Sequence, residues 1–185
     1  MSWIIDASHS QLNFSVRHMM IANVRGRFEN FTGSVDFDEA DPTRTSVNVQ
    51  IEAASINTNE PKRDAHLRSP DFLDAENYPT IHFTSKEVKV LSAQRGQIIG
   101  DLTIRGVSNE VVLDVEYLGQ SKSPWGTLNA GFSASTKINR KDWGLAWNVA
   151  LETGGVLVSD EMTIHIDVEL IKQPEGELEE AAVGD

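Results

Sequence analysis

The chain has 185 residues, 39% hydrophobic and 24% charged, a composition typical of one folded domain with a sizeable core. Its formal net charge of −12 argues against nucleic acid, which needs a basic face, and against electrostatic docking to an anionic membrane. It contains no cysteine, which excludes disulfides, thiolate catalysis and zinc–sulfur sites.

The two ends of the chain bear on its location and on the bounds of its domain. The N-terminus has neither a basic segment nor a long apolar run, so we expect no signal peptide and predict a cytoplasmic location. A trimmed secreted precursor would begin in the same way. Residues 173–185 contain five acidic residues and no basic one, which predicts a disordered acidic tail behind a domain at residues 1–172.

The first third of the chain alternates between apolar and polar residues with a period near two, which is typical of half-buried strands. Strands are predicted over residues 10–20, 27–38 and 45–56, with a turn at 23–26 between the first two. Gly33 lies inside the second strand and indicates a bulge or a bend.

The longest stretch without this alternation is residues 57–85, and its signals are helical. Asn59 can cap a first turn that contains Pro61, and Ser69 can cap a second turn that begins with proline. We therefore predict a short helical lid near residues 59–76, inserted between strands.

Alternation returns after the lid. Near Lys86 it shifts by one residue, which again indicates a bulge. A second long connection, residues 139–155, contains Trp143 and Trp147, which we expect to plug one end of a barrel. Strands are predicted over residues 80–91, 97–105, 110–118, 127–138 and 160–171.

These segments give eight main strands, with a short one before them at residues 3–6. No helical pattern of ten or more residues separates successive strands, so antiparallel pairing is expected. The predicted fold class is all-β: an elongated eight-stranded antiparallel barrel with a short helical lid insertion. A two-sheet sandwich is the alternative.

The length of the strands bears on what the barrel holds. Several reach 11 or 12 residues, which makes a tall, narrow tube. Small residues on its apolar faces leave room for a long, thin ligand, or else accommodate bulky neighbours such as Phe132 and Trp147 in a solid core. The small residues are Gly33, Gly100, Ala130 and Ala134.

Known catalytic motifs are absent from the sequence. None of the five histidines has the spacing of a metal site, and there is no Gly-x-Ser-x-Gly elbow or phosphate loop, so no metal or cofactor is expected. The densest titratable cluster is Arg63, Asp64 and His66. A functional role would make Asp64 and His66 an acid–base pair, or Arg63 and His66 anchors for a polar head group. The structural alternative, which we favour, is an ion-paired network that fixes the lid.

Several motifs together resemble one family, the YceI-like or polyisoprenoid-binding proteins, along residues 3–170. The resemblance implies a lipocalin-like barrel that holds an isoprenoid or fatty chain. It implies no set of catalytic residues. The matching motifs include FSVRHM at 14–19, GRF at 26–28, RDAHL at 63–67, GDLTIRGV at 100–107 and GG at 154–155.

Two functions are compatible with this pattern. The first is binding or carriage of a long-chain amphiphile, such as a polyisoprenoid, an isoprenoid quinone precursor or a fatty-acid derivative. The second is an enzyme that acts on a lipid at the barrel mouth with Asp64 and His66. The sequence does not set the oligomeric state, and a homodimer is compatible with it. The predicted ligand-binding residues are Phe14, Val16, Phe37, Phe83, Leu102, Ile104, Phe132 and Ile164.

Overall fold

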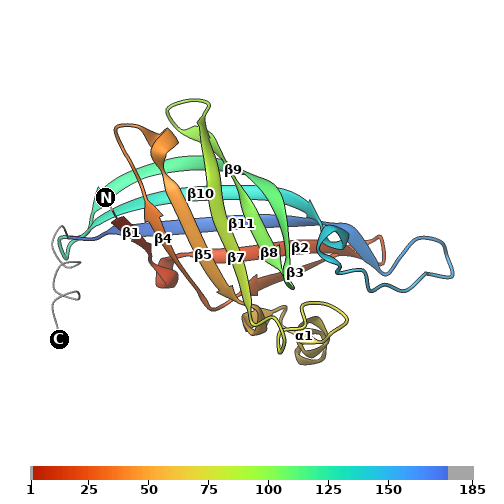
Figure 1. The fold of residues 1–185 in the computed structure, drawn as a ribbon. Coiled ribbons are helices and arrows are strands. Elements are labelled where there is room, and N and C mark those ends of the chain that lie inside the picture. The colour runs from red at the N-terminus through yellow and green to blue at the C-terminus, as the bar shows by residue number, and fades with distance from the viewer. Residues whose placement is uncertain (1, 175–185) are drawn as a thin grey trace.

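Eight antiparallel strands close into a barrel in the computed structural model, which describes residues 2–174 (Figure 1). The barrel closes where β1 pairs with β11. The predicted fold is confirmed, and the sandwich alternative is wrong. From residue 175 onward, the predicted acidic tail lies outside the described residues. The barrel strands are β1 (Ser2–Ile5), β4 (Phe31–Asp36), β5 (Ser46–Glu52), β7 (Thr80–Val90), β8 (Arg95–Ile104), β9 (Val107–Lys122), β10 (Leu128–Asn139) and β11 (Val158–Lys172).

Three further strands extend the sheet beyond the barrel, β2 (Gln11–His18), β3 (Ala22–Phe28) and β6 (Ile56–Asn57). The C-terminal half of β11 pairs with β1 and its N-terminal half pairs with β2. A short 3-10 turn, η1 (Ala7–His9), separates β1 from β2. The β2–β3 hairpin therefore continues the sheet outside the closed barrel, with β2 paired to the N-terminal half of β11 and β3 at its outer side (Figure 1).

The predicted turn at residues 23–26 is wrong, because these residues lie inside β3 and the turn lies at 19–21. Gly26, the last residue of that predicted turn, leaves space for a side chain of the adjacent strand. A Cβ on Gly26 would lie 2.4 Å from the ring of Phe14. Gly33 has the same role: the β4–β5 register runs through it without a bulge, and a Cβ there would meet Ile5 at 2.5 Å. The bulge expected near Lys86 is confirmed.

The lid contains one helix, α1 (Pro61–Arg68), and a series of turns after it. The capping prediction for Asn59 is wrong, because Glu60 caps the helix by accepting hydrogen bonds from the N–H groups of Lys62 and Arg63. Ser69 ends the helix, where its N–H donates to the carbonyl of His66. As predicted, Ser69 also caps the turn that follows, because its Oγ accepts from the N–H of Asp71 at 3.3 Å and its carbonyl accepts from the N–H of Phe72 at 3.0 Å. The other 3-10 turns are η2 (Pro42–Arg44), η3 (Ala53–Ser55) and η4 (Arg140–Trp143). Across residues 2–174, no helix is long and apolar enough to cross a membrane.

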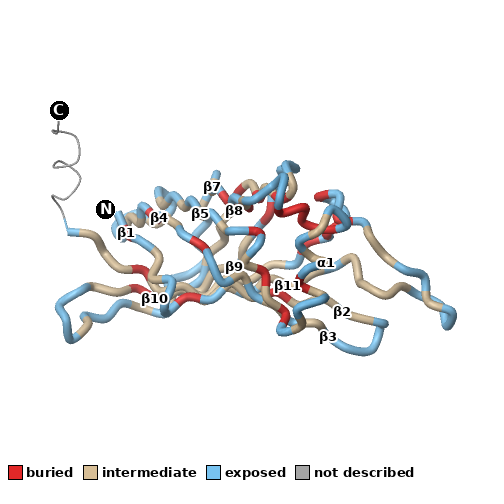
Figure 2. The backbone as a smooth tube through the Cα atoms, turned by 90° about the horizontal axis from the view of Figure 1, so that it is seen from below, coloured by how far each residue is buried: buried red, intermediate tan, exposed pale blue. Residues whose placement is uncertain are grey.

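The core has two parts at different heights in the barrel. The larger lies at the end covered by α1 and η4 and includes Phe14, Leu73, Ile104 and Trp143. Figure 2 shows buried backbone beside α1, where residues 72–75 form an unbroken buried run. The smaller part surrounds Trp3, which is fully buried where β1 meets β11. Between the two parts the barrel is not filled.

Candidate ligand-binding site

The barrel encloses an apolar cavity of about 470 Å³. Strands β5 and β7 to β11 direct their inward side chains into it, as the period-two alternation requires. Apolar side chains account for most of this lining. They include Val47, Val49, Phe83, Ile98, Leu102, Leu113, Phe132, Ala134, Ile166 and Val168.

Polar residues gather at one end of this cavity, at the barrel end opposite α1. They come from the β4–β5 loop, the β7–β8 hairpin and the C-terminal part of β9. Thr45 is notable among them, because its buried Oγ1 has no hydrogen-bond partner within the described residues. We call this end the mouth. Its polar lining is Glu39, Thr45, Lys89, Ser92, Gln94, Arg95, Gln97 and Gln120.

An aromatic group forms the cavity wall near the mouth. The Phe37 ring meets that of Phe132 edge to face at 5.6 Å, and Tyr117 lies 5.2 Å from Phe132. Trp3 completes the group behind Phe37 at 6.1 Å. Rigid rings of this kind give a wall of fixed shape that suits a slender apolar ligand.

The opposite end is sealed by η4 and the loop that follows it. The indole of Trp143 is buried, and its Nε1 donates to the carbonyl of Leu102 at 2.8 Å. Trp147 lies further out, where its ring contacts His66 at 4.6 Å and Phe72 at 5.4 Å. Both tryptophans therefore belong to the closed end, as expected from the sequence.

The Arg63, Asp64 and His66 cluster also belongs to this closed end, and its members do not act on one another as an acid–base pair. Asp64 is buried, and its Oδ1 accepts from the backbone N–H and the hydroxyl of Thr58, at 2.9 and 2.5 Å. Arg63 donates to the Thr58 hydroxyl and carbonyl, both at 2.8 Å. His66 bonds instead to Asp71 at 2.8 Å. Neither Asp64 nor His66 lines the cavity.

A model of the YceI-like domain matches residues 3–170. The chain belongs to the YceI-like family. It is 39% identical to protein YceI of Escherichia coli O157:H7 over 168 residues, which cover 91% of this chain and 84% of that one. The crystal structure of the Campylobacter jejuni YceI protein has 36% identity and a TM-score of 0.75, over 85% of this chain and 90% of that one. A polyisoprenoid-binding domain from Saccharophagus degradans has the same fold at 17% identity, with a TM-score of 0.65, over 92% of this chain and 98% of that one.

Half of the eight predicted ligand-binding residues line the cavity of this YceI-like barrel: Phe37, Phe83, Leu102 and Phe132. The other half lie deeper, within or against the core of the closed end, and are Phe14, Val16, Ile104 and Ile164. Contact of any of the eight with a ligand stays a prediction. The sequence argument missed Val47, Val49, Ile98 and Leu113, although they show the same alternation. It also missed the polar residues of the mouth.

The Thr58–Asp64 contact fixes the lid of this YceI-like protein, so Asp64→Ala is expected to lower the free energy of unfolding by about 1–3 kcal/mol. The buried Thr58 N–H and hydroxyl would lose their acceptor. Urea unfolding measures the change, and Asp64→Asn, which keeps one oxygen, should recover part of it. Asp71→Ala, at a half-exposed site, is the matched control and should cost less. An Asp64→Ala variant of unchanged stability that no longer bound lipid would contradict this role.

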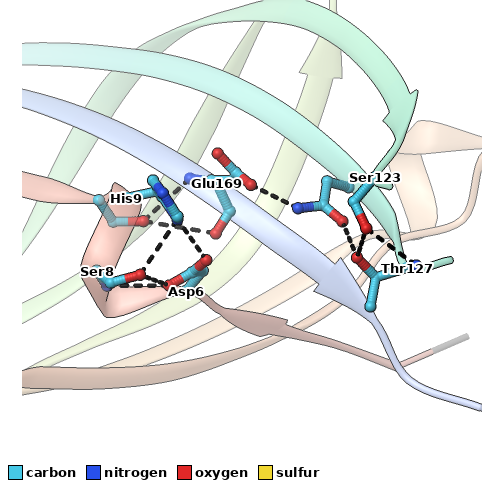
Figure 3. A network of polar contacts seen from close by, with 8 residues as sticks. Asp6, Ser8, His9, Ser123, Thr127 and Glu169 are labelled. Atoms are coloured by element: carbon cyan, nitrogen blue, oxygen red, sulfur yellow. Dashed lines mark hydrogen bonds and ion pairs between the residues drawn. The ribbon is translucent and has the colours of Figure 1, made fainter. Parts of the chain in front are cut away.

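A polar network on the outer barrel wall ties η1 to β11 near the mouth (Figure 3). Asp6 accepts from Ser8 with Oδ1 and contacts His9 Nδ1 with Oδ2 at 2.8 Å. The backbone of Glu169 is bonded to Ser10, and its side chain accepts from Asn129 at 2.5 Å. The atoms of Asp6, His9 and Glu169 that could coordinate a metal ion lie within 4.8 Å of one another. Both carboxylates already have hydrogen-bond partners in the network. We therefore assign this network a structural role, in which it holds the β1–β2 junction against β11.

This network should make stability depend on pH. The hydrogen bond to Asp6, and then the charges of Asp6 and Glu169, raise the pKa of His9 above 6.5. The folded state therefore binds the proton more tightly, so the stabilisation is complete below pH 6.5 and is lost as pH rises through the raised pKa. The Tm difference between wild type and His9→Gln should be largest in mild acid and vanish in mild alkali. Parallel pH profiles of the two proteins would contradict the assignment.

Proposed function

We propose that this chain binds a long-chain amphiphile, with the apolar chain inside the barrel and the polar end at the mouth. One observation carries the proposal: a single cavity of about 470 Å³ combines an apolar interior, a sealed end and a polar mouth. The volume lies in the range of small-molecule sites. The polar side chains of the mouth, Gln97 and Gln120 among them, can form hydrogen bonds with a polar group held there.

The energetics of such binding require little from the polar end. Burial of about ten methylenes contributes on the order of 8 kcal/mol before the cost of ordering the ligand. A ligand of this kind would remain bound through purification. The candidate classes are a polyisoprenoid, an isoprenoid quinone precursor and a fatty-acid derivative, and the polyisoprenoid-binding neighbour from S. degradans supports the first. An apolar tube discriminates by length and width, so weak selection among chains of similar size is expected.

The geometry does not favour the alternative, an enzyme that uses Asp64 and His66 at the mouth. Both residues lie with the lid at the sealed end, and the bound carboxylate oxygen of Asp64 is already shared by two donors from Thr58. A catalytic base needs an accessible lone pair within reach of its substrate. Carriage of an intact lipid is therefore the function that the arrangement supports best.

Native mass spectrometry of the purified protein, followed by solvent extraction, tests this proposal. We expect a complex heavier than the chain by one lipid, and an extract that contains that lipid unchanged. Protein stripped of lipid and refolded should rebind it and release no product. An empty cavity under native conditions, with no uptake from added prenyl or fatty chains, would contradict the proposal. The same spectrum tests whether the chain forms a homodimer, while the cytoplasmic location stays a prediction.

A further inference from the structure

The β2–β3 hairpin has a charge opposite to that of the whole protein. Residues 11–28 contain three arginines, one histidine and no acidic residue, in a chain with a formal net charge of −12. Arg17 pairs with Asn23 across the hairpin and Arg25 with Ser15, so both arginines lie on the same outward face. This face is a basic surface on an acidic protein.

The arginines of this surface are mostly free to bind an external anion. Arg17 and Arg25 are exposed, and neither has an acidic partner within ion-pair distance in residues 2–174. Arg27 pairs with Glu29 at 3.0 Å. The acidic residues on the neighbouring elements include Asp160, which pairs with Lys141 at 3.2 Å, Glu161, whose carboxylate lies 3.8 Å from Lys137, and Glu152 in the adjoining loop.

The tip of the hairpin is apolar and exposed. Met19, Met20 and Ile21 have 44, 51 and 84% of their surface exposed. Met19 and Met20 adopt positive φ angles of 51° and 65°, a conformation that Asn or Gly adopts at lower cost in a hairpin turn. Local folding thus does not explain the choice of methionine, and strained residues of this kind concentrate at functional sites.

The neighbouring loop enlarges this apolar tip. The N–H of Met19 donates to the carbonyl of Leu157 at 2.8 Å, and the N–H of Leu157 donates to the carbonyl of Val149 at 2.9 Å. Val149 is itself 47% exposed. Met20 lies against the Gly154–Gly155 turn, where a Cβ on Gly155 would approach its side chain to 3.2 Å. Two segments far apart in the sequence therefore present one apolar edge.

The basic hairpin and the mouth lie at opposite ends of the barrel (Figure 1). The β4–β5 loop at the mouth has three acidic residues against one arginine, Arg44, over residues 37–45. A negatively charged surface therefore attracts the hairpin and repels this loop, and a surface that binds the hairpin lies at the far end from the mouth.

We propose that the β2–β3 hairpin docks the protein on an anionic lipid bilayer. Met19, Met20 and Ile21 enter the boundary between head groups and acyl chains, while Arg17 and Arg25 lie at the level of the lipid phosphates. The net charge of the chain argues against such docking, but the charge of the contacting surface decides it, because exposed charges are screened within about 8 Å at physiological salt. Docked in this way, the barrel holds its mouth toward the aqueous phase.

Vesicle co-sedimentation with the full chain tests the proposal. Vesicles of equal parts phosphatidylglycerol and phosphatidylcholine should bind the protein, with affinity that falls as salt rises, and vesicles of phosphatidylcholine alone should bind it weakly. Arg17→Gln combined with Arg25→Gln should lower the partition coefficient by about tenfold or more. Ile21→Ser should lower it several-fold. Far-UV circular dichroism verifies that each variant is folded.

Matched variants at the mouth end separate docking by the hairpin from a general effect of charge or hydrophobicity. Arg44→Gln with Lys122→Gln removes the same charge, and Trp125→Ser removes a side chain that is 88% exposed. Both should bind as wild type. Because the chain has no cysteine, a fluorophore on Ile21→Cys or Trp125→Cys reports which end enters the bilayer. Equal loss in the mouth-end variants, a blue shift at position 125 only, or no binding by wild type would overturn the proposal.

Discussion

Ala134→Trp is expected to expel the bound lipid and leave the barrel folded. Ala134 lines the cavity from the middle of β10, where its small side chain leaves space beside Phe132 of the aromatic wall. An indole directed inward would occupy that space and displace the ligand instead of compressing a packed core. We expect lipid recovered by extraction to fall about tenfold or more, since a chain of ten methylenes would lose several of its contacts. Far-UV circular dichroism should be unchanged.

Two matched substitutions on the same strand serve as controls for Ala134→Trp. Ser135→Trp directs the same ring outward, beside the exposed His165, and should retain the lipid of the wild type. Ala130→Trp meets no free space, because Ala130 is buried against Trp3 and Leu170, so it should destabilise the fold through overpacking. Full lipid retention in Ala134→Trp would show that the ligand lies elsewhere, and the cavity would lose its assigned role.

Arg140→Ala is expected to destabilise the fold more than Asp64→Ala does. The guanidinium is 2% exposed and donates to the carbonyls of Ser159, Leu145, Trp147 and Val158. These bonds hold the loop after η4 against β11 and keep the sealed end in place. Its removal leaves several buried carbonyls without donors, so the free energy of unfolding should fall by about 3–5 kcal/mol.

Arg140→Lys should recover only part of that loss. The planar guanidinium of arginine donates to several carbonyls at once, and the compact ammonium of lysine cannot reach all of them. Lys141→Ala is the control. Lys141 is half-exposed and pairs at 3.2 Å with Asp160, whose other oxygen lies 3.7 Å from the Arg140 guanidinium, so loss of Lys141 should cost less than about 1 kcal/mol. Urea unfolding at neutral pH measures all three. If Arg140→Ala and Lys141→Ala proved equally stable, the carbonyl contacts would not be what holds the sealed end.

Features of the fold that depend on neighbouring residues could be predicted, whereas those set by distant contacts could not. The shift of alternation near Lys86 marked a real bulge, because a bulge changes the pattern within its own strand. Gly26 was misjudged because the reason for a glycine there is the ring of Phe14 on the adjacent strand. The hydrogen-bond acceptors around Arg140 are backbone carbonyls of residues 145–159. Because every residue has a backbone carbonyl, the sequence does not indicate which of them bind the guanidinium.

The prediction of the cavity was limited in a different way. Alternation tells which side chains point inward, and the inward faces were chosen correctly for Phe83 and Leu102 on adjacent strands. It does not tell how far along the barrel axis a residue lies. Phe14 and Ile104 point inward as well, but at the height that the closed end fills. Depth depends on strand tilt and register, which the pairing of the whole sheet determines.

The joint between β1 and β11 has a consequence for how the chain folds. Trp3 pairs with Lys172, so the contact that completes the barrel joins residues separated by nearly the whole domain. Closure of so long a loop is costly in entropy and slow, and it must await the last strand. During synthesis, the apolar faces of seven strands would emerge from the ribosome before the eighth could cover them. Until then the barrel is an open sheet whose two edges are unpaired, and this interval is when the protein is most prone to aggregate.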